Sequence, residues 1–331
     1  MNPTPSAETP LIQVLLATYN GARFLREQID SVLAQSYPAV ELLLRDDGSR
    51  DGTQAILEEY AANHPGRIRV LPNDGSTGHA KTNFLRLLQA STAPYVAFCD
   101  QDDEWLPNKL ELEMAAMRGL EAEHGTQTPL LVFTDLRVVD EHLKTIAESF
   151  WKHQLLAEET IDHFERILAQ NVVTGCTELM NDALRSLVLR MPEEAHMHDW
   201  WSALCVSSMG HAALVRQPTV QYRQHENNVL GALRNKPVTG IPIWRNHGKR
   251  KERWEMSLHQ AEAMLRVYPH ELPSAAVRKL KAMLRCEQSP NRFVRVFTFV
   301  TNRFFAKGYR GNFATAWYLW DLDEARRQQK N

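Results

Sequence analysis

Three aspartates follow a run of β-prone residues in "YVAFCDQDDEW", at positions 95–105. Asp100, Asp102 and Asp103 stand within four positions of one another. Carboxylates this close repel one another, and none is buried cheaply without a partner. A D-x-D sequence at the end of a buried strand suits a hard divalent cation that also holds phosphate oxygens. The alternative is a solvated acidic turn that caps the helix expected near Pro107, because Asp is favoured at helix N-termini.

A second polar group is "RDDGSRDGT", at positions 45–53. In one interpretation it is a tight turn in which Gly48 and Gly52 supply flexibility while Asp51 and Thr53 cap the next helix. In the other, a carboxylate at the strand end accepts the imide N–H of uracil or thymine, or ribose hydroxyls. The residues alone leave both interpretations open.

A third group, "HMHDWW" at positions 196–201, combines one carboxylate, Asp199, with His198 and two tryptophans. A carboxylate in such surroundings suits a general base whose pKa is tuned by its neighbours. The alternative makes Asp199 a helix N-cap and places Trp200 and Trp201 in the core.

The segment "YRQHENN", at positions 222–228, ends a strand-like run in a polar cluster that contains His225. His225 is a candidate metal ligand or phosphate contact, and the alternative is a surface histidine. A zinc site built from His196, His198 and His225 is a further hypothesis, but no ligand spacing supports it.

The frame for these groups is a regular alternation over the first 135 residues. Strand-like runs at 11–20, 40–47, 67–71, 95–99 and 130–134 alternate with helical patterns, one of them at 53–63. This alternation predicts an α/β fold with a mostly parallel sheet covered by helices on both faces. Ligands bind beyond the carboxyl ends of strands in such sheets. Positions 18–20, 46–49 and 100–103 lie at such ends, so we expect them to form one site.

Charge divides the chain into an acidic front and a basic tail. The whole chain has 38 Lys and Arg residues and 40 Asp and Glu residues. Residues 241–331 contain 18 of the basic residues and only 8 of the acidic ones. Pro and Gly near 236–242 suggest a boundary, so we predict one domain at 1–240, which holds the site, and a basic, mostly helical region at 241–331. Arg and Lys interleaved with aromatic residues suit the surface of an anionic membrane. Nucleic-acid binding and plain helix packing are the alternatives.

Several features predict a cytoplasmic protein. The four cysteines are scattered and have no metal-type spacing, which is typical of reduced, buried thiols. The first ten residues lack the basic and apolar regions of a signal peptide. The longest apolar runs have about eight residues, far fewer than the roughly 20 that cross a bilayer.

Taken in order, these segments resemble family 2 glycosyltransferases with the GT-A fold. "VLLATYNGARFLREQIDSVLAQSYPAVELLLRDDGSRDGT" is similar to the opening signature of that family, and "FCDQDDEWLPNKL" resembles its metal-binding strand end. "TGCTELMN", "HDWW" and "YRQHENNVLGA" resemble later motifs of bacterial rhamnosyltransferase-like members. The resemblance covers about residues 11–232 and implies a Rossmann-like sheet with a C-terminal helical extension.

The resemblance also implies roles for individual residues. Asp199 matches the catalytic base, although family members commonly have two acidic residues there and this chain has His198 before a single one. Asp102 and His225 match the ligands of Mn²⁺ or Mg²⁺. Acceptor binding is implied for Gly175, Trp200 and Asp103. Nucleotide-sugar binding is implied for Thr18, Tyr19, Asn20, Asp47, Lys81, Asn83 and Asp100.

The implied activity is an inverting, metal-dependent transfer of a sugar from a nucleotide diphosphate to a glycan acceptor in bacterial surface polysaccharide synthesis. We expect dTDP-rhamnose as the donor, with a UDP-hexose as the alternative. We expect a polyprenyl-diphosphate-linked acceptor, met at the inner face of the cytoplasmic membrane, and no nucleic-acid partner. A non-catalytic sugar-nucleotide-binding protein is the alternative from another class, but the presence of both Asp102 and Asp199 argues against it. A nucleotidyltransferase is disfavoured because "TYNGARF" is not a Gly-rich phosphate loop.

Overall fold

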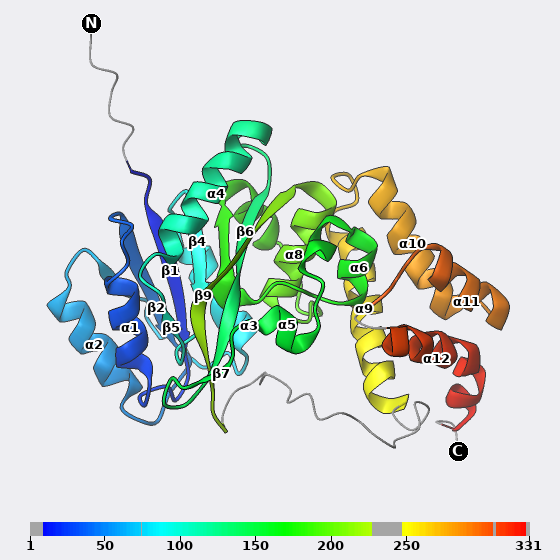
Figure 1. Cartoon of the computed structure of the whole chain (residues 1–331), viewed down its shortest axis with the longest axis horizontal. Helices are drawn as coiled ribbons and strands as arrows, with labels where there is room; N and C mark the ends of the chain where they lie inside the picture. Colours follow the sequence, from blue (N-terminus) through cyan, green and yellow to red (C-terminus); the bar gives the residue numbers. More distant parts are fainter. Residues whose placement is uncertain (1–8, 74, 227–246, 307–308, 329–331) are drawn as a thin grey trace, which may run out of the picture. The chain divides into compact units, whose positions relative to one another are not determined.

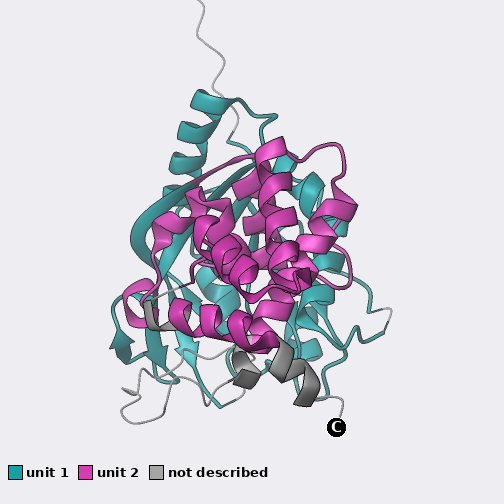
Figure 2. Cartoon of the chain, turned by 90° about the vertical axis from the view of Figure 1, so that its right-hand side faces the viewer, with its two compact units in different colours: residues 1–150, 175–189, 213–231 teal, residues 151–174, 190–212, 232–331 magenta. Residues whose placement is uncertain are grey.

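The computed structural model describes residues 9–73, 75–226, 247–306 and 309–328. The end of the "YRQHENNVLGA" motif and the predicted boundary at 240/241 lie outside the described residues. The chain divides into two compact units (Figure 2). Unit 1 comprises residues 1–150, 175–189 and 213–231, and unit 2 comprises 151–174, 190–212 and 232–331. The division into domains at 1–240 and 241–331 stays a prediction.

Unit 1 is built on a twisted sheet whose first half is parallel. The strands pair in the order β3-β2-β1-β4, and Ile12 lies opposite both Val40 and Tyr95. The side chains of β1 and β4 are almost all buried on both faces, as expected for parallel strands covered by helices. The bounds of these strands are Ile12–Thr18 for β1, Val40–Asp46 for β2, Ile68–Val70 for β3 and Tyr95–Cys99 for β4.

Antiparallel strands continue the sheet beyond β4. The order is β4-β8-β6-β9-β5, and β7 pairs with β6. The predicted α/β fold is confirmed. These strands are β5 (Glu104–Trp105), β6 (Leu130–Asp140), β7 (Thr145–Ala147), β8 (Glu178–Asn181) and β9 (His211–Gln224).

Helices flank the sheet of unit 1 (Figure 1). Helix α1 buries Leu25, Ile29 and Val32, which recur on one side of the helix at the spacing that an amphipathic pattern requires. A single 3₁₀ turn, η2 (Gly175–Thr177), leads into β8. The helices are α1 (Leu25–Leu33), α2 (Thr53–Asn63), α3 (Ala80–Ala90), α4 (Lys109–His124) and α7 (Asp182–Val188).

Unit 2 is helical, and the helices predicted for the tail are confirmed. Among the described residues, no helix combines the length and the apolar content that crossing a membrane requires. Its main elements are η1 (Glu158–Asp162), α6 (Phe164–Ala169), α8 (His198–Met209), α9 (His247–Val267), α10 (Ser274–Gln288), α11 (Arg292–Thr301) and α12 (Tyr309–Gln328). The short helix α5 (Phe150–Gln154) begins where unit 1 ends.

A buried ion pair lies in the first turns of α4. The Lys109 ammonium donates to Glu113 with both side chains fully buried, and it also lies 4.3 Å from the centre of the Trp105 ring. Burial raises the pKa of Glu113 to about 7, and the charge of Lys109 only partly offsets this effect. The folded protein therefore holds a proton on Glu113 more tightly than the unfolded chain does.

This pair predicts a pH dependence of stability. The contribution of Glu113 to the free energy of unfolding is complete below pH 4.5, its ordinary pKa, and is lost as the pH rises through about 7. We expect the wild type to lose about 2–3 kcal/mol between pH 5 and pH 8 that Glu113→Gln does not lose. Urea denaturation of both proteins at the two pH values measures this difference, and equal losses would contradict the prediction.

Candidate functional site

The loop after β1 and the loop after β2 are tied together at the carboxyl edge of the sheet. The Thr18 hydroxyl donates to Asp46 at 3.0 Å, and Asp46 also accepts from the backbone N–H groups of Gly48 and Ser49. Asn20, which has a φ of 49°, accepts from the backbone N–H of Arg50 at 2.9 Å. Asp46 and Asn20 therefore fix the shape of the edge that the sequence predicts to hold a nucleotide.

Asp47, predicted to bind the nucleotide, anchors the loop that follows β3. Its carboxylate accepts from the backbone N–H of Thr77 at 2.6 Å and of Gly78 at 3.0 Å. It also accepts from the buried guanidinium of Arg45 at 3.1 Å. Asp47 is buried, so it shapes the edge of the sheet through the loop at 76–78.

Asn83 and Lys81 both lie in the first turn of α3, but in different surroundings. Asn83 is buried, accepts from Arg45 at 2.8 Å and donates to the carbonyl groups of Thr18 and Arg45. Asn83 therefore links the end of β1 to the end of β2 through the backbone carbonyl groups of both strands. The Lys81 side chain is half-buried. The nucleotide-binding roles of both residues stay predictions.

Gln101, between the aspartates of the D-x-D sequence, links the end of β4 to the end of β1. Its side chain accepts from the backbone N–H of Tyr19 at 2.8 Å and donates to the carbonyl of Tyr19 at 3.0 Å. A Cβ atom at Gly21 would lie 2.2 Å from Oε1 of Gln101, so only glycine leaves room for this contact. Tyr19 itself is exposed. Sequence reasoning missed Gln101, because a side chain that bonds the backbone of a distant loop leaves no periodic signal.

The two predicted metal ligands meet in the structure. His225, just after β9, lies with Nε2 2.8 Å from Oδ2 of Asp102, although 123 residues separate them along the chain. Both side chains are largely but not completely buried. The ring of Phe24 packs 5.1 Å from the His225 ring. A carboxylate oxygen and an imidazole nitrogen therefore lie side by side at the edge of unit 1.

The other two aspartates form a second cluster with a cysteine. Asp100, Asp103 and Cys176 offer ligand atoms that lie within 4.8 Å of one another. Asp103 is fully buried, and its Oδ1 accepts from the backbone N–H of Arg223 at 3.1 Å. Burial, followed by the charges of Asp102 and Asp100, raises the pKa of Asp103 well above its ordinary value. Gly175, the predicted acceptor-binding residue, immediately precedes Cys176 in η2.

Arg223 holds this acidic loop in place. Its buried guanidinium donates to the carbonyl of Asp102 at 2.9 Å and to the carbonyl of Glu141 at 3.0 Å. It also donates to the carboxylate of Glu27 at 2.6 Å, and it lies 4.5 Å from the centre of the Phe24 ring. Sequence reasoning quoted the motif that contains Arg223 but did not single the residue out.

Arg223→Ala should cost about 2–4 kcal/mol of unfolding free energy, because it removes a buried guanidinium that donates to two partly buried carbonyl groups. Arg223→Lys should recover only part of this loss, since a lysine cannot serve all three acceptors. The matched control is Arg137→Ala, which removes only a surface pair with Glu148 and should cost less than about 1 kcal/mol. Chemical denaturation measures all three, and equal costs for the two alanine variants would contradict the role of Arg223.

The remaining predicted residues, Asp199 and Trp200, lie in the first turn of α8 in unit 2. Asp199 is half-buried, and its Oδ1 accepts from the backbone N–H of Trp200 at 2.6 Å. Trp200 is buried, and its indole N–H donates to the carbonyl of Ile167 at 2.7 Å, which makes it a packing residue of this unit. Burial lowers the pKa of His198 to about 3, so His198 is neutral at physiological pH. The catalytic and sugar-stacking roles of Asp199 and Trp200 stay predictions.

The donor set of unit 1 fits a divalent cation of the Mn²⁺ or Mg²⁺ type. Carboxylate oxygens and one imidazole are the ligands that such ions accept. Full burial raises the pKa of the Asp103 carboxyl group, and the Cys176 thiol beside it only partly offsets this effect. Among the described residues, His196, His198 and His225 do not appear together as a group of metal ligands.

Comparison with solved structures agrees with the sheet topology. The chain superposes on S. aureus TarS 1–349 in complex with UDP-GlcNAc with a TM-score of 0.56 and 16% identity, over 96% of this chain and 92% of that one. At this identity the likeness shows the fold alone. Unit 1 and the helices that follow it therefore have the fold of the GT-A glycosyltransferases.

The sequence is similar to a family model and to several known proteins. Residues 13–177, just under half of the chain, match the model of Glycosyl transferase family 2. The dTDP-rhamnosyl transferase RfbG of Shigella flexneri is 26% identical over 66% of this chain and 74% of its own length. The UDP-Glc:alpha-D-GlcNAc-diphosphoundecaprenol beta-1,3-glucosyltransferase WfgD of Escherichia coli is 36% identical over 32% of this chain and 41% of its own length.

Proposed function

We propose that the protein is an inverting, divalent-metal-dependent glycosyltransferase that moves a sugar from a nucleotide diphosphate to a glycan acceptor in bacterial surface polysaccharide synthesis. The observation that carries this proposal is the contact of Asp102 with His225, at the edge where the loops after β1, β2 and β4 meet. Parallel strands present their ligands at this edge.

The donor would lie along that edge. Tyr19 and Asn20 would border the base and ribose, over a floor that Thr18, Asp47 and Asn83 keep rigid. Lys81 would border the nucleotide, and Asp100 would face the ribose and the metal. Asp102 and His225 would hold the Mn²⁺ or Mg²⁺ ion. The bound ion would offset the negative charge that develops on the leaving diphosphate.

The transfer needs one base and no enzyme nucleophile. The acceptor hydroxyl oxygen attacks the anomeric carbon from the face opposite the diphosphate, the bond from that carbon to the diphosphate oxygen breaks, and the configuration inverts. The carboxylate of Asp199 takes the hydroxyl proton. Burial keeps His198 neutral, so this ring adds no positive charge next to Asp199.

The favoured donor is dTDP-rhamnose, and a UDP-hexose is the alternative. The first is supported by the likeness to RfbG, which extends over two thirds of the chain. The second is supported by the higher identity to WfgD, which is confined to a shorter segment. The name of WfgD includes a diphosphoundecaprenol acceptor, which supports a lipid-linked acceptor for this protein at the cytoplasmic face of a membrane.

Turnover of candidate donors tests the proposal. The purified chain is incubated with Mn²⁺ and with UDP-, dTDP- or GDP-sugars, with and without a polyprenyl-diphosphate glycan, and the products are separated by mass spectrometry. We expect release of the nucleoside diphosphate together with extension of the glycan by one sugar. Release of pyrophosphate, or turnover of no donor with any glycan acceptor, would overturn the proposal.

A further inference from the structure

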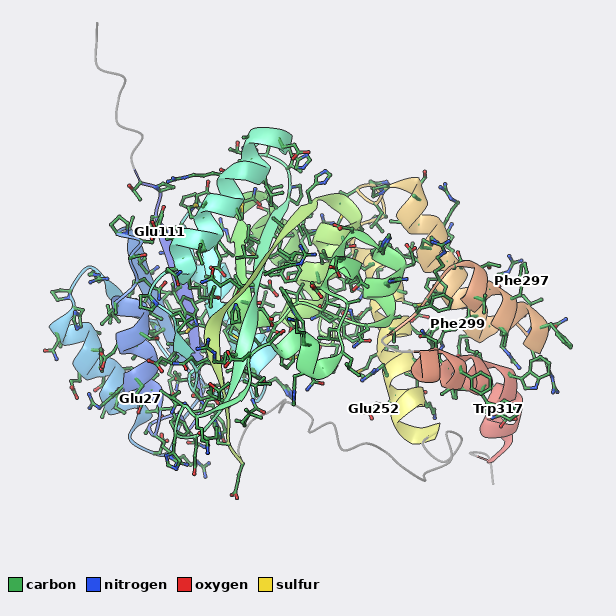
Figure 3. All side chains as sticks on the ribbon, in the orientation of Figure 1. Glu27, Glu111, Glu252, Phe297, Phe299 and Trp317 are labelled. Carbon is green, nitrogen blue, oxygen red and sulfur yellow. The ribbon has the colours of Figure 1, made fainter. Side chains whose placement is uncertain are left out.

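Helix α11 buries a charge and exposes its large apolar side chains. Phe293, Phe297 and Val300, spaced i, i+4 and i+7 on one face, are 68%, 70% and 49% exposed. On the opposite side, Arg295 and Phe299 are buried. Phe297 and Phe299 are labelled in Figure 3. Arg295 donates to the carbonyl of Ser289 at 3.2 Å. A surface helix normally turns its apolar side chains toward the core and its charged ones toward solvent. An exposed apolar face of this kind marks a site of interaction.

Helix α12 extends the same face. Phe313 and Trp317 are 60% and 45% exposed, and Trp320 follows Trp317 on that side of the helix. The ring of Trp320 packs 4.9 Å from the ring of Phe293, which joins the two helices at their apolar sides. The α11–α12 apolar face is made of Phe293, Val294, Phe297, Val300, Phe313 and Trp317.

The segment that holds α10 and α11 is basic, whereas the sequence of α12 has three arginines and three acidic residues. Residues 274–301 contain six Arg and Lys residues and one acidic residue, Glu287. On α10, three exposed basic residues lie on one face at the spacing i, i+3 and i+7: Arg278, Lys281 and Arg285. Arg292 lies with its guanidinium 5.3 Å from the centre of the Trp320 ring, at the border of the apolar face.

We propose that the α11–α12 apolar face docks on the surface of an anionic lipid bilayer. Aromatic and aliphatic side chains would enter the boundary between headgroups and acyl chains, while the surrounding cations attract anionic headgroups. A second copy of this chain fits less well, because an isologous contact would bring two basic surfaces together. The inference deepens the proposed function, since a lipid-linked acceptor would be met at that surface.

Vesicle sedimentation tests the docking surface without donor, metal or acceptor. The full chain is mixed with phosphatidylcholine vesicles that contain roughly 30% phosphatidylglycerol, and with vesicles of phosphatidylcholine alone. We expect binding to the anionic vesicles that weakens at least about fivefold when NaCl is raised from about 0.05 M to about 0.5 M. The double variant Phe297→Ser/Trp317→Ser should lower the partition constant by at least about tenfold.

The matched control is Leu155→Ser, which removes an apolar side chain of unit 2 that is 70% exposed but lies outside the α11–α12 apolar face. It should bind vesicles as the wild type does. Equal loss in both variants, or no binding of the wild type to anionic vesicles, would overturn the inference. So would a wild-type dimer that the double variant converts to a monomer without any vesicle binding. Turnover with a water-soluble glycan acceptor, measured separately, tests the proposed function independently of this surface.

Discussion

Replacing Asp199 by Asn should lower kcat of sugar transfer by at least about 10³-fold, because the variant cannot take the proton of the attacking hydroxyl. The side chain keeps its size, and Oδ1 still accepts from the backbone N–H of Trp200, so α8 should keep its first turn. Binding of the nucleotide should be unchanged. Steady-state kinetics with the preferred donor measures kcat, and calorimetry measures binding.

The matched control for Asp199 is Asp182→Asn, in the first turn of α7. Asp182 is exposed and pairs with Arg185, so its replacement should leave kcat within about twofold of the wild type. Wild-type turnover in Asp199→Asn would remove the residue from the chemistry. Loss of nucleotide binding in that variant would instead place Asp199 in the binding site of the nucleotide-sugar donor.

The second large effect is expected for Asp102→Asn. The substitution keeps a side-chain oxygen near Nε2 of His225 but removes the negative charge that a divalent cation requires. We expect kcat/KM to fall by at least about 10³-fold at a fixed concentration of Mn²⁺, with partial recovery when Mn²⁺ is raised. Initial rates across a Mn²⁺ titration measure both effects.

A neighbouring acidic residue supplies the control for Asp102. Glu104 is half-buried and accepts from the Gln221 side chain at 2.7 Å, outside the predicted ligand set. Glu104→Gln should leave the Mn²⁺ dependence unchanged. The metal assignment would be contradicted if Asp102→Asn and Glu104→Gln showed the same Mn²⁺ titration as the wild type.

The sequence was sufficient to predict the frame of the fold, because buried parallel strands leave continuous apolar runs. The strand at Tyr95–Cys99 and the helix at Thr53–Asn63 have the predicted bounds. The antiparallel continuation of the sheet was not specified, since β6 and β9 lie far apart in the sequence and no short turn joins them. The interleaving of two compact units is likewise a property of long-range contacts.

The candidate site was predicted by residue type but not by its supports. The carboxyl-edge rule and the family resemblance led to Asp102 and His225, which are in contact. Neither could indicate that Gln101 bonds the backbone of Tyr19, or that Arg223 donates to the carbonyl of Asp102. These are contacts of side chains with distant backbone atoms, and they depend on the folded geometry alone.

The basic-aromatic composition of the tail suggested a membrane surface, but helical periodicity alone would have placed Phe293 and Phe297 inside. The structure reverses that orientation because Arg295 and Phe299 occupy the buried side of α11. The particular surface could therefore be identified only from the packing of α11 against its neighbours.

Metal-dependent nucleotide binding by three proteins tests the central claim most directly. Wild type, Asp102→Asn and Asp199→Asn are titrated by calorimetry with UDP and dTDP, with and without Mn²⁺. We expect one nucleotide to bind the wild type and Asp199→Asn at least about tenfold more tightly with Mn²⁺ than without it, and Asp102→Asn to lose this gain. Equal affinities with and without Mn²⁺ in all three proteins would contradict the account.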